Sequence, residues 1–117
     1  MSVLKEIISN KLEEVDQRAT LVPLNRLKDT QRLFSIRNFK QSLLADSIQI
    51  IAEIKKRSPS NNNINLNTDP LIIADSYQKN GACSISVLTD QKYFGGHIDL
   101  IHKVKNLFNE CKIDITK

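Results

Sequence analysis

The chain has 117 residues, a length that fits one domain built around a single core. Its hydrophobic share of 40% and charged share of 26% match folded globular proteins, so collagen-like and disordered classes are excluded. The 17 Lys and Arg residues against 13 Asp and Glu give a net charge of +4. These charges form no basic run, which favours an ordinary solvated surface over a nucleic-acid footprint.

Apolar runs and cysteines suggest the compartment. No apolar run approaches the roughly 18 residues that span a bilayer, and Lys5 and Glu6 fall where a secretory signal would be apolar. Cys83 and Cys111 form no CxxC pair, which argues against a disulfide scaffold and against a zinc site. We therefore expect a cytoplasmic protein with reduced thiols and no membrane partner.

The first part of the chain is patterned as helices. Over residues 3–15, apolar side chains recur at helical spacing with charged residues between them, which predicts an amphipathic helix. After the break at Pro23, the apolar pattern of residues 27–44 predicts one or two short helices. We group residues 1–47 as a helical extension.

A strand and a helix follow. Residues 48–54 are nearly all apolar, rich in β-branched side chains and too few for a buried helix, so they predict a buried parallel strand. Asp69-Pro70 supplies an N-cap and a proline suited to a first helical turn. The predicted helix then covers residues 71–80 and ends at Gly81.

The same alternation continues to the C-terminus. Residues 83–88 predict a second strand, 89–96 a loop, 98–108 an amphipathic helix and 113–116 a third strand. Strands about 30 residues apart with helices between them are typical of parallel βαβ units. Because no glycine-rich turn follows the first strand, a nicotinamide-binding domain is disfavoured and a segment of a (β/α) barrel fits better.

The first strand ends in two opposite charges. Residues two apart in a strand share a face, so Glu53 and Lys55 project to the same side, opposite Ile54. In a (β/α) barrel the carboxyl ends of the strands carry the function, and a carboxylate beside an ammonium there can transfer protons or hold an anionic substrate. The alternative is a salt bridge that only terminates the strand.

Three stretches of sequence resemble one family. Residues 53–60 read Glu-Ile-Lys-Lys-Arg-Ser-Pro-Ser, residues 86–90 read Ser-Val-Leu-Thr-Asp, and residues 92–96 read Lys-Tyr-Phe-Gly-Gly. Together these resemble the first and second barrel strands of indole-3-glycerol phosphate synthase, and the helical N-terminus is similar to that family's extension over the barrel mouth. The resemblance covers nearly the whole chain. It implies an α/β fold, namely a partial (β/α)₈ TIM barrel with an N-terminal helical extension. The barrel part, residues 48–117, would contain the first two βα units and the start of the third strand.

The resemblance also implies an activity. The family is a carboxy-lyase of tryptophan biosynthesis that converts 1-(2-carboxyphenylamino)-1-deoxyribulose 5-phosphate to indole-3-glycerol phosphate with loss of carbon dioxide and water. The implied partner is this phosphorylated small molecule, with no cofactor and no metal. His97 and His102 do not alter that expectation, because they lie five apart with no third ligand in view.

The matched positions give the expected site. By resemblance, Lys55 contacts the substrate carboxylate and takes part in proton transfer, Glu53 orients and balances it, and Lys117 is the general acid. The matched substrate-binding residues are Ser58, Pro59 and Phe94. Two alternatives stay open: Phe94 as an ordinary core phenylalanine, and Lys117 as a terminal lysine without a role.

A complete barrel of this kind takes roughly 250 residues. We therefore expect this chain to be the N-terminal part of the enzyme, inactive alone, and to associate with the missing C-terminal part of the barrel. The competing interpretation is a non-catalytic remnant or interaction module derived from that barrel. A nucleic-acid binder is disfavoured, because only 5% of the residues are aromatic and no basic face is clustered.

Overall fold

The computed structural model describes residues 2–108 and 114–116. The chain forms two compact units, residues 1–35 (the N-terminal unit) and residues 36–117 (the C-terminal unit), and each is described by itself. The predicted grouping of residues 1–47 as the extension of one barrel domain concerns the complete protein and stays a prediction.

The N-terminal unit is helical. Helix α1 spans Val3–Leu21, with the Ser2 side chain accepting a hydrogen bond from Lys5 N as its cap, and α2 spans Leu24–Lys28. The predicted end of the first helix at residue 15 was wrong, because residues 16–21 carry no apolar repeat yet have no helix breaker before Pro23. No described helix combines the length and the apolar composition needed to cross a membrane.

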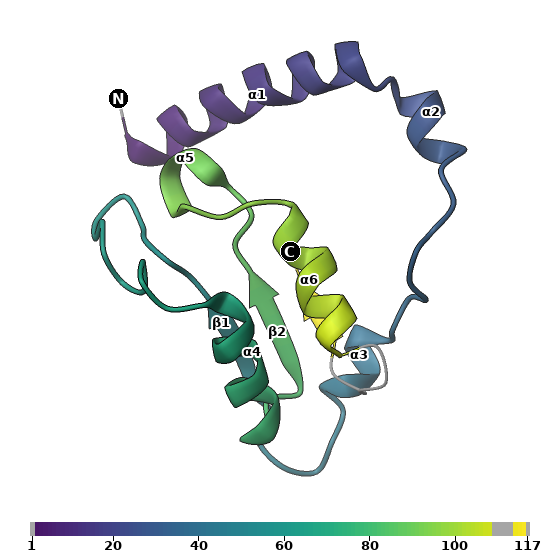
Figure 1. The fold of residues 1–117 in the computed structure, drawn as a ribbon, viewed down its shortest axis with the longest axis vertical. Coiled ribbons are helices and arrows are strands. Elements are labelled where there is room, and N and C mark those ends of the chain that lie inside the picture. The colour runs from purple at the N-terminus through teal and green to yellow at the C-terminus, as the bar shows by residue number, and fades with distance from the viewer. Residues whose placement is uncertain (1, 109–113, 117) are drawn as a thin grey trace. The chain divides into compact units, whose positions relative to one another are not determined.

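The C-terminal unit contains a parallel sheet, as predicted. Its strands β1 (Ile51–Ile54), β2 (Ser84–Val87) and β3 (Asp114–Thr116) lie in the order β1-β2-β3. Figure 1 labels the first two of these strands. Glu53 is the register partner of Ser86, and Ser86 is the partner of Thr116. The carboxyl ends of the strands therefore lie along one edge of the sheet.

Strand β1 differs from its prediction. It begins at Ile51 rather than at residue 48, and Ile54 is its only buried residue. Ile48 is 93% exposed and Ile50 is 56% exposed. The apolar pattern correctly predicted a strand, but the prediction that this strand is buried on both faces was wrong. Strand β1 lies at the edge of the described sheet, and only one face of that sheet carries a layer of helices.

The two longer helices of the C-terminal unit lie within one residue of their predicted bounds. Helix α4 spans Pro70–Lys79, and the Asp69 side chain caps it by accepting from Leu71 N at 2.9 Å. Helix α6 spans Asp99–Leu107 and buries Ile101 and Val104. Both helices follow strands of one parallel sheet, so each returns from the carboxyl edge to the amino edge.

The core lies between the sheet and helices α4 and α6. Its buried side chains alternate along the strands and repeat along the helices: Ile54, Ala74, Ile85, Val87, Ile101, Val104 and Phe108. The opposite face of the sheet, called here the open face, carries Ile51, Glu53 and Ser86, and Ile51 is 48% exposed.

A short helix, α3 (Phe39–Ser42), lies near the amino edge of the sheet. Ser42 Oγ is 3.2 Å from Ser84 Oγ at the start of β2, and Ser84 is fully buried. Arg37, just before α3, donates a hydrogen bond of 2.5 Å to the carbonyl of Phe108 at the end of α6. Hydrogen bonds therefore hold α3, the start of β2 and the end of α6 together at the amino edge of the sheet. The loops that follow β1 and β2 lie at the opposite, carboxyl edge.

Candidate active site

A salt bridge at the carboxyl edge joins the two charged residues at the end of β1. Lys55 Nζ lies 2.7 Å from Glu53 Oε1, and Ser86 Oγ donates to Glu53 Oε2 at 3.4 Å. The side chains of Lys55 and Glu53 are 31% and 44% exposed. An ion pair this open to water contributes only about 0–1 kcal/mol to folding, so stability alone gives little reason for two charges here.

Glu53 is also fixed through its backbone. Tyr77 of α4 donates its hydroxyl to the Glu53 carbonyl oxygen at 2.8 Å. This bond spans from the helix layer to the strand and holds the end of β1 in place while the Glu53 side chain faces the open side. The strand spacing predicted that Glu53 and Lys55 share a face, whereas Tyr77 and Ser86 could be assigned to the site only once the sheet register was known.

The second loop contains a short helix that the sequence pattern did not predict. Residues 89–96 were expected to be a loop, but α5 spans Gln91–Phe94. Asp90 caps this helix by accepting from Tyr93 N at 2.7 Å, and Gly95 ends it in the left-handed region with φ of +64°. A four-residue helix has no apolar repeat to detect, so its two caps were the only signal.

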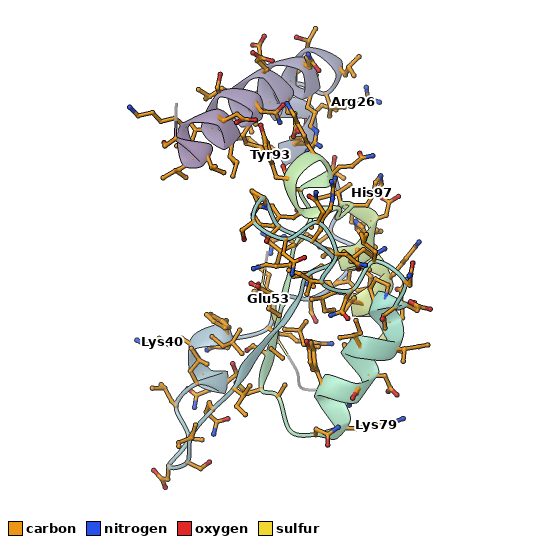
Figure 2. The ribbon with its side chains drawn as sticks, turned by 90° about the vertical axis from the view of Figure 1, so that its left-hand side faces the viewer. Arg26, Lys40, Glu53, Lys79, Tyr93 and His97 are labelled. Carbon is orange, nitrogen blue, oxygen red and sulfur yellow. The ribbon has the colours of Figure 1, made fainter. Side chains whose placement is uncertain are left out.

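Phe94 is the last residue of α5 and lies beside the ion pair. Its ring centroid is 5.8 Å from Lys55 Nζ, within the range of a cation–π interaction. The Phe94 side chain is partly exposed. Figure 2 shows Tyr93 and His97, which flank this segment, at one end of the unit, Lys79 at the opposite end, and Glu53 between them.

Ser58 and Pro59 lie in a turn further along the first loop. Ser58 and Asn61 exchange backbone hydrogen bonds of 2.8 and 3.1 Å, with Pro59 and Ser60 at the tip. Ser58 is partly buried and Pro59 is exposed. No hydrogen bond or ion pair joins this turn to Glu53 or Lys55 in the part of the chain that the structure describes.

Of the predicted site residues, the structure brings Glu53, Lys55 and Phe94 together. Ser58 and Pro59 lie in a separate turn further along the loop that carries Lys55. Lys117 lies outside the described residues, as does Cys111. The structure pairs β3 with β2 up to Thr116, and the predicted role of Lys117 stays a prediction.

A cavity of about 710 Å³ lies on the helix side of the same edge. Apolar side chains, among them Ile54, Leu88 and Phe94, line it together with Lys56 and Lys103. Glu53 and Lys55 are not part of its lining, since they project to the open face. Phe94 is therefore shared between this cavity and the ion pair.

Within the described residues, the histidines and carboxylates do not converge on a metal site. His97 Nδ1 lies 3.4 Å from Asp99 Oδ2, and both side chains are well exposed. Among the described side chains of residues 2–108, no three His, Cys, Asp or Glu residues are grouped so as to hold a metal ion. The chemistry that this edge offers is that of an ammonium, a carboxylate and an aromatic ring.

Comparison with known proteins agrees on one family. The family model described as indole-3-glycerol phosphate synthase matches residues 4–114. Proteins named indole-3-glycerol phosphate synthase from Streptococcus pneumoniae, strains Hungary19A-6 and CGSP14, are each 40% identical to this chain over 103 residues. The aligned part is 88% of this chain but 38% of each relative, so the chain spans well under half of their length.

Proposed function

The chain belongs to the indole-3-glycerol phosphate synthase family, and from that premise we propose that it supplies the first part of the active site of such a synthase. The reaction converts 1-(2-carboxyphenylamino)-1-deoxyribulose 5-phosphate to indole-3-glycerol phosphate, carbon dioxide and water, a step of tryptophan biosynthesis. The observation that carries the proposal is the placement of the Lys55 ammonium beside the Phe94 ring.

The family fold is a TIM barrel, and we assign β1, β2 and β3 to its first three strands. In such a barrel the open face of this sheet, with Glu53 and Ser86, would look into the interior, and the carboxyl edge would form part of the catalytic mouth. The phosphate-binding loops and further catalytic groups would come from strands beyond this chain. Association with that C-terminal part is therefore required for activity.

The substrate carries a carboxylate on the carbon next to the one that bears its nitrogen, directly attached to a flat aromatic ring. A site for this group needs a cation and an apolar plane within a few ångströms of one another. Lys55 Nζ and the Phe94 ring, 5.8 Å apart, are placed to supply that pair. Lys55 would hold the carboxylate while Phe94 packs on the ring.

The reaction forms a bond between the ring carbon that bears the carboxylate and the carbonyl carbon of the sugar chain. A general acid, the role proposed for Lys117, protonates the carbonyl oxygen as that bond forms. The carboxylate then leaves as carbon dioxide, and its bonding electrons return to the ring. Loss of the new hydroxyl as water, with one carbon-bound proton, completes the indole.

Glu53 acts on Lys55 in this proposal. Its carboxylate lies 2.7 Å from the ammonium, so it orients the lysine and balances its charge before and after the substrate carboxylate leaves. Ser86, which donates to the other Glu53 oxygen, helps to fix that orientation. Ser58 and Pro59 would line the substrate pocket from the turn of the same loop.

The experiment uses a full-length synthase whose first 117 residues are this chain, completed with the C-terminal remainder of a pneumococcal relative. Formation of indole-3-glycerol phosphate is followed by its indole-ring fluorescence. Lys55→Ala should lower kcat/KM by about 10²–10⁴-fold, the range expected on loss of a positioned proton-transfer and charge-stabilising group.

Lys79→Ala is the matched control. Lys79 also forms an ion pair, 2.6 Å from Asp75 Oδ2, but on α4 at the opposite end of the unit. Its removal should leave kcat/KM unchanged. Near-normal turnover of the Lys55 variant, or equal losses in both variants, would contradict the assignment of Lys55.

A further inference from the structure

Arg57 joins the loop after β1 to helix α5. Its Nη2 atom donates hydrogen bonds to two successive carbonyl oxygens, those of Gln91 at 2.9 Å and Lys92 at 2.8 Å. A four-residue helix leaves most of its carbonyls without partners in the helix itself. A guanidinium has several donors in one rigid plane, so a single arginine can serve both carbonyls at once.

Gly95 makes room for this arginine. A Cβ atom at Gly95 would lie 3.0 Å from Arg57 Nε and 3.3 Å from Arg57 Cγ, which is tighter than ordinary contact. Gly95 also has a φ of +64°, a conformation that residues with a side chain rarely adopt. The arginine and the glycine are therefore fitted to one another at the end of α5.

The hydrogen bonds from Arg57 to α5 affect the placement of both proposed substrate contacts, Lys55 and Phe94. Phe94 lies between Lys92, whose carbonyl Arg57 holds, and Gly95, over which Arg57 lies. Lys55 is two residues before Arg57 on the same loop. A shift of α5 against that loop would therefore change the separation between the Phe94 ring and Lys55 Nζ.

We infer that Arg57 is a positioning residue that sets the distance between the Phe94 ring and the Lys55 ammonium by holding α5 against the loop after β1. The kinetic consequence of this inference rests on the proposed function, whereas its geometric consequence does not. Because the carboxylate and the ring of the substrate are directly bonded, both contacts form together only at a suitable separation. Losing Arg57 weakens them in the ground state and the transition state alike, which raises KM and leaves kcat nearly unchanged.

Arg37 provides a matched control. It too is an arginine of the C-terminal unit that donates to a backbone carbonyl, that of Phe108 at 2.5 Å, but at the amino edge of the sheet. Arg37→Ala therefore removes a comparable bond without touching α5. Arg57→Lys is the conservative variant, because one ammonium still reaches this region but lacks the planar pair of donors.

The first measurement reads the geometry in the full-length synthase that carries this chain. Selectively labelled phenylalanine and lysine give the nuclear Overhauser contact between the Phe94 ring and the Lys55 side chain. Arg57→Ala should weaken that contact at least threefold, Arg57→Lys should weaken it less, and Arg37→Ala should leave it unchanged. An unchanged contact in Arg57→Ala would overturn the inference.

The second measurement is kinetic. Arg57→Ala should raise KM about tenfold with kcat within about twofold, as expected on loss of charge-assisted hydrogen bonds that act equally on ground and transition states. Added guanidinium should lower that KM again. The same rise in KM for Arg37→Ala would show a general loss of structure and overturn the inference.

The two measurements separate the two proposals. If the full-length synthase without substitutions makes no indole-3-glycerol phosphate but the Phe94–Lys55 contact responds to Arg57→Ala, the proposed function fails and the positioning role stands. If the parent is active while Arg57→Ala keeps both the contact and KM, the positioning role fails and the function stands.

Discussion

Gly96 tolerates no side chain in this structure. It is buried just after α5, and a Cβ atom there would lie 2.0 Å from the Leu88 carbonyl oxygen and 2.9 Å from Thr89 Cα. These are backbone atoms of the two residues that follow β2, so they cannot rotate away as a flexible side chain could. Substitution with alanine must therefore move the chain itself.

The size of that effect follows from what holds the chain there. Gly96 N donates to the Asp90 carbonyl at 2.8 Å, and Leu88 N donates to the Ile54 carbonyl at 3.3 Å. Overpacking a buried position costs about 1–3 kcal/mol, and losing one of these hydrogen bonds adds about 1 kcal/mol. We expect Gly96→Ala to lower the free energy of unfolding by about 2–4 kcal/mol.

Urea unfolding of the full-length synthase that carries this chain, followed by circular dichroism, measures this loss. Gly81→Ala is the control, because nothing lies within 4 Å of its added Cβ and only its φ of +89° opposes the change. That strain costs about 1–2 kcal/mol. The steric reasoning is refuted if Gly96→Ala costs less than Gly81→Ala.

Three further substitutions test single contacts. Asp69→Ala removes the cap of α4 and should cost about 1 kcal/mol in urea unfolding, whereas Asp69→Asn should recover most of it; equal losses would contradict the capping role. Tyr77→Phe keeps the ring but removes the hydrogen bond to the Glu53 carbonyl, so the free energy of unfolding should fall by about 1 kcal/mol. An unchanged free energy of unfolding would show that this hydrogen bond does not stabilise the fold. Glu53→Gln should lower kcat at least about tenfold, and unchanged kcat in the fluorescence assay would exclude the proposed role of Glu53. The same substitution should change the free energy of unfolding by under about 1 kcal/mol, because the ion pair with Lys55 is half-exposed.

The sequence predicted the elements best where local chemistry and burial agree. Helix α4 begins at Pro70, one residue before its predicted start, because Asp69 and Pro70 act through local hydrogen bonding and fixed φ that need no tertiary contact. The extent of β1 was predicted poorly. Its apolar run from residue 48 describes a strand buried on both faces, and burial depends on neighbours that the local pattern does not contain.

In the candidate site too, only the features that follow from local rules could be predicted from the sequence. Alternation along a strand is a local rule, so the shared face of Glu53 and Lys55 followed from their spacing. Arg57 and Ser86 depend on sequence-distant partners, since one bonds α5 and the other meets Glu53 through the register of β1 with β2. Strand register and loop contacts of this kind depend on packing across the whole unit. A local sequence pattern therefore does not determine them.

The exposed isoleucines in and just before β1 lead to a prediction about the 117-residue chain when it is purified alone. Ile48, Ile50 and Ile51 are 93%, 56% and 48% exposed, and full burial of each such side chain is worth roughly 1.5–3 kcal/mol. Against a usual net stability of about 5–15 kcal/mol, the missing burial removes a large share of the margin. We therefore expect a broad thermal transition and no synthase activity from the isolated chain.

Adding the C-terminal strands as a separately expressed fragment should sharpen that transition and restore formation of indole-3-glycerol phosphate. The second fragment would cover Ile51 on the open face and bring the remaining catalytic groups to Glu53 and Lys55. The assay is a thermal melt followed by circular dichroism, beside indole fluorescence with the carboxyphenylamino-deoxyribulose phosphate. A fragment from an unrelated TIM barrel is the control and should do neither, since it lacks side chains complementary to this face. Sustained turnover and a cooperative high-temperature melt from the chain alone would show that the exposed isoleucines cost little, and the reasoning from burial would have to be abandoned.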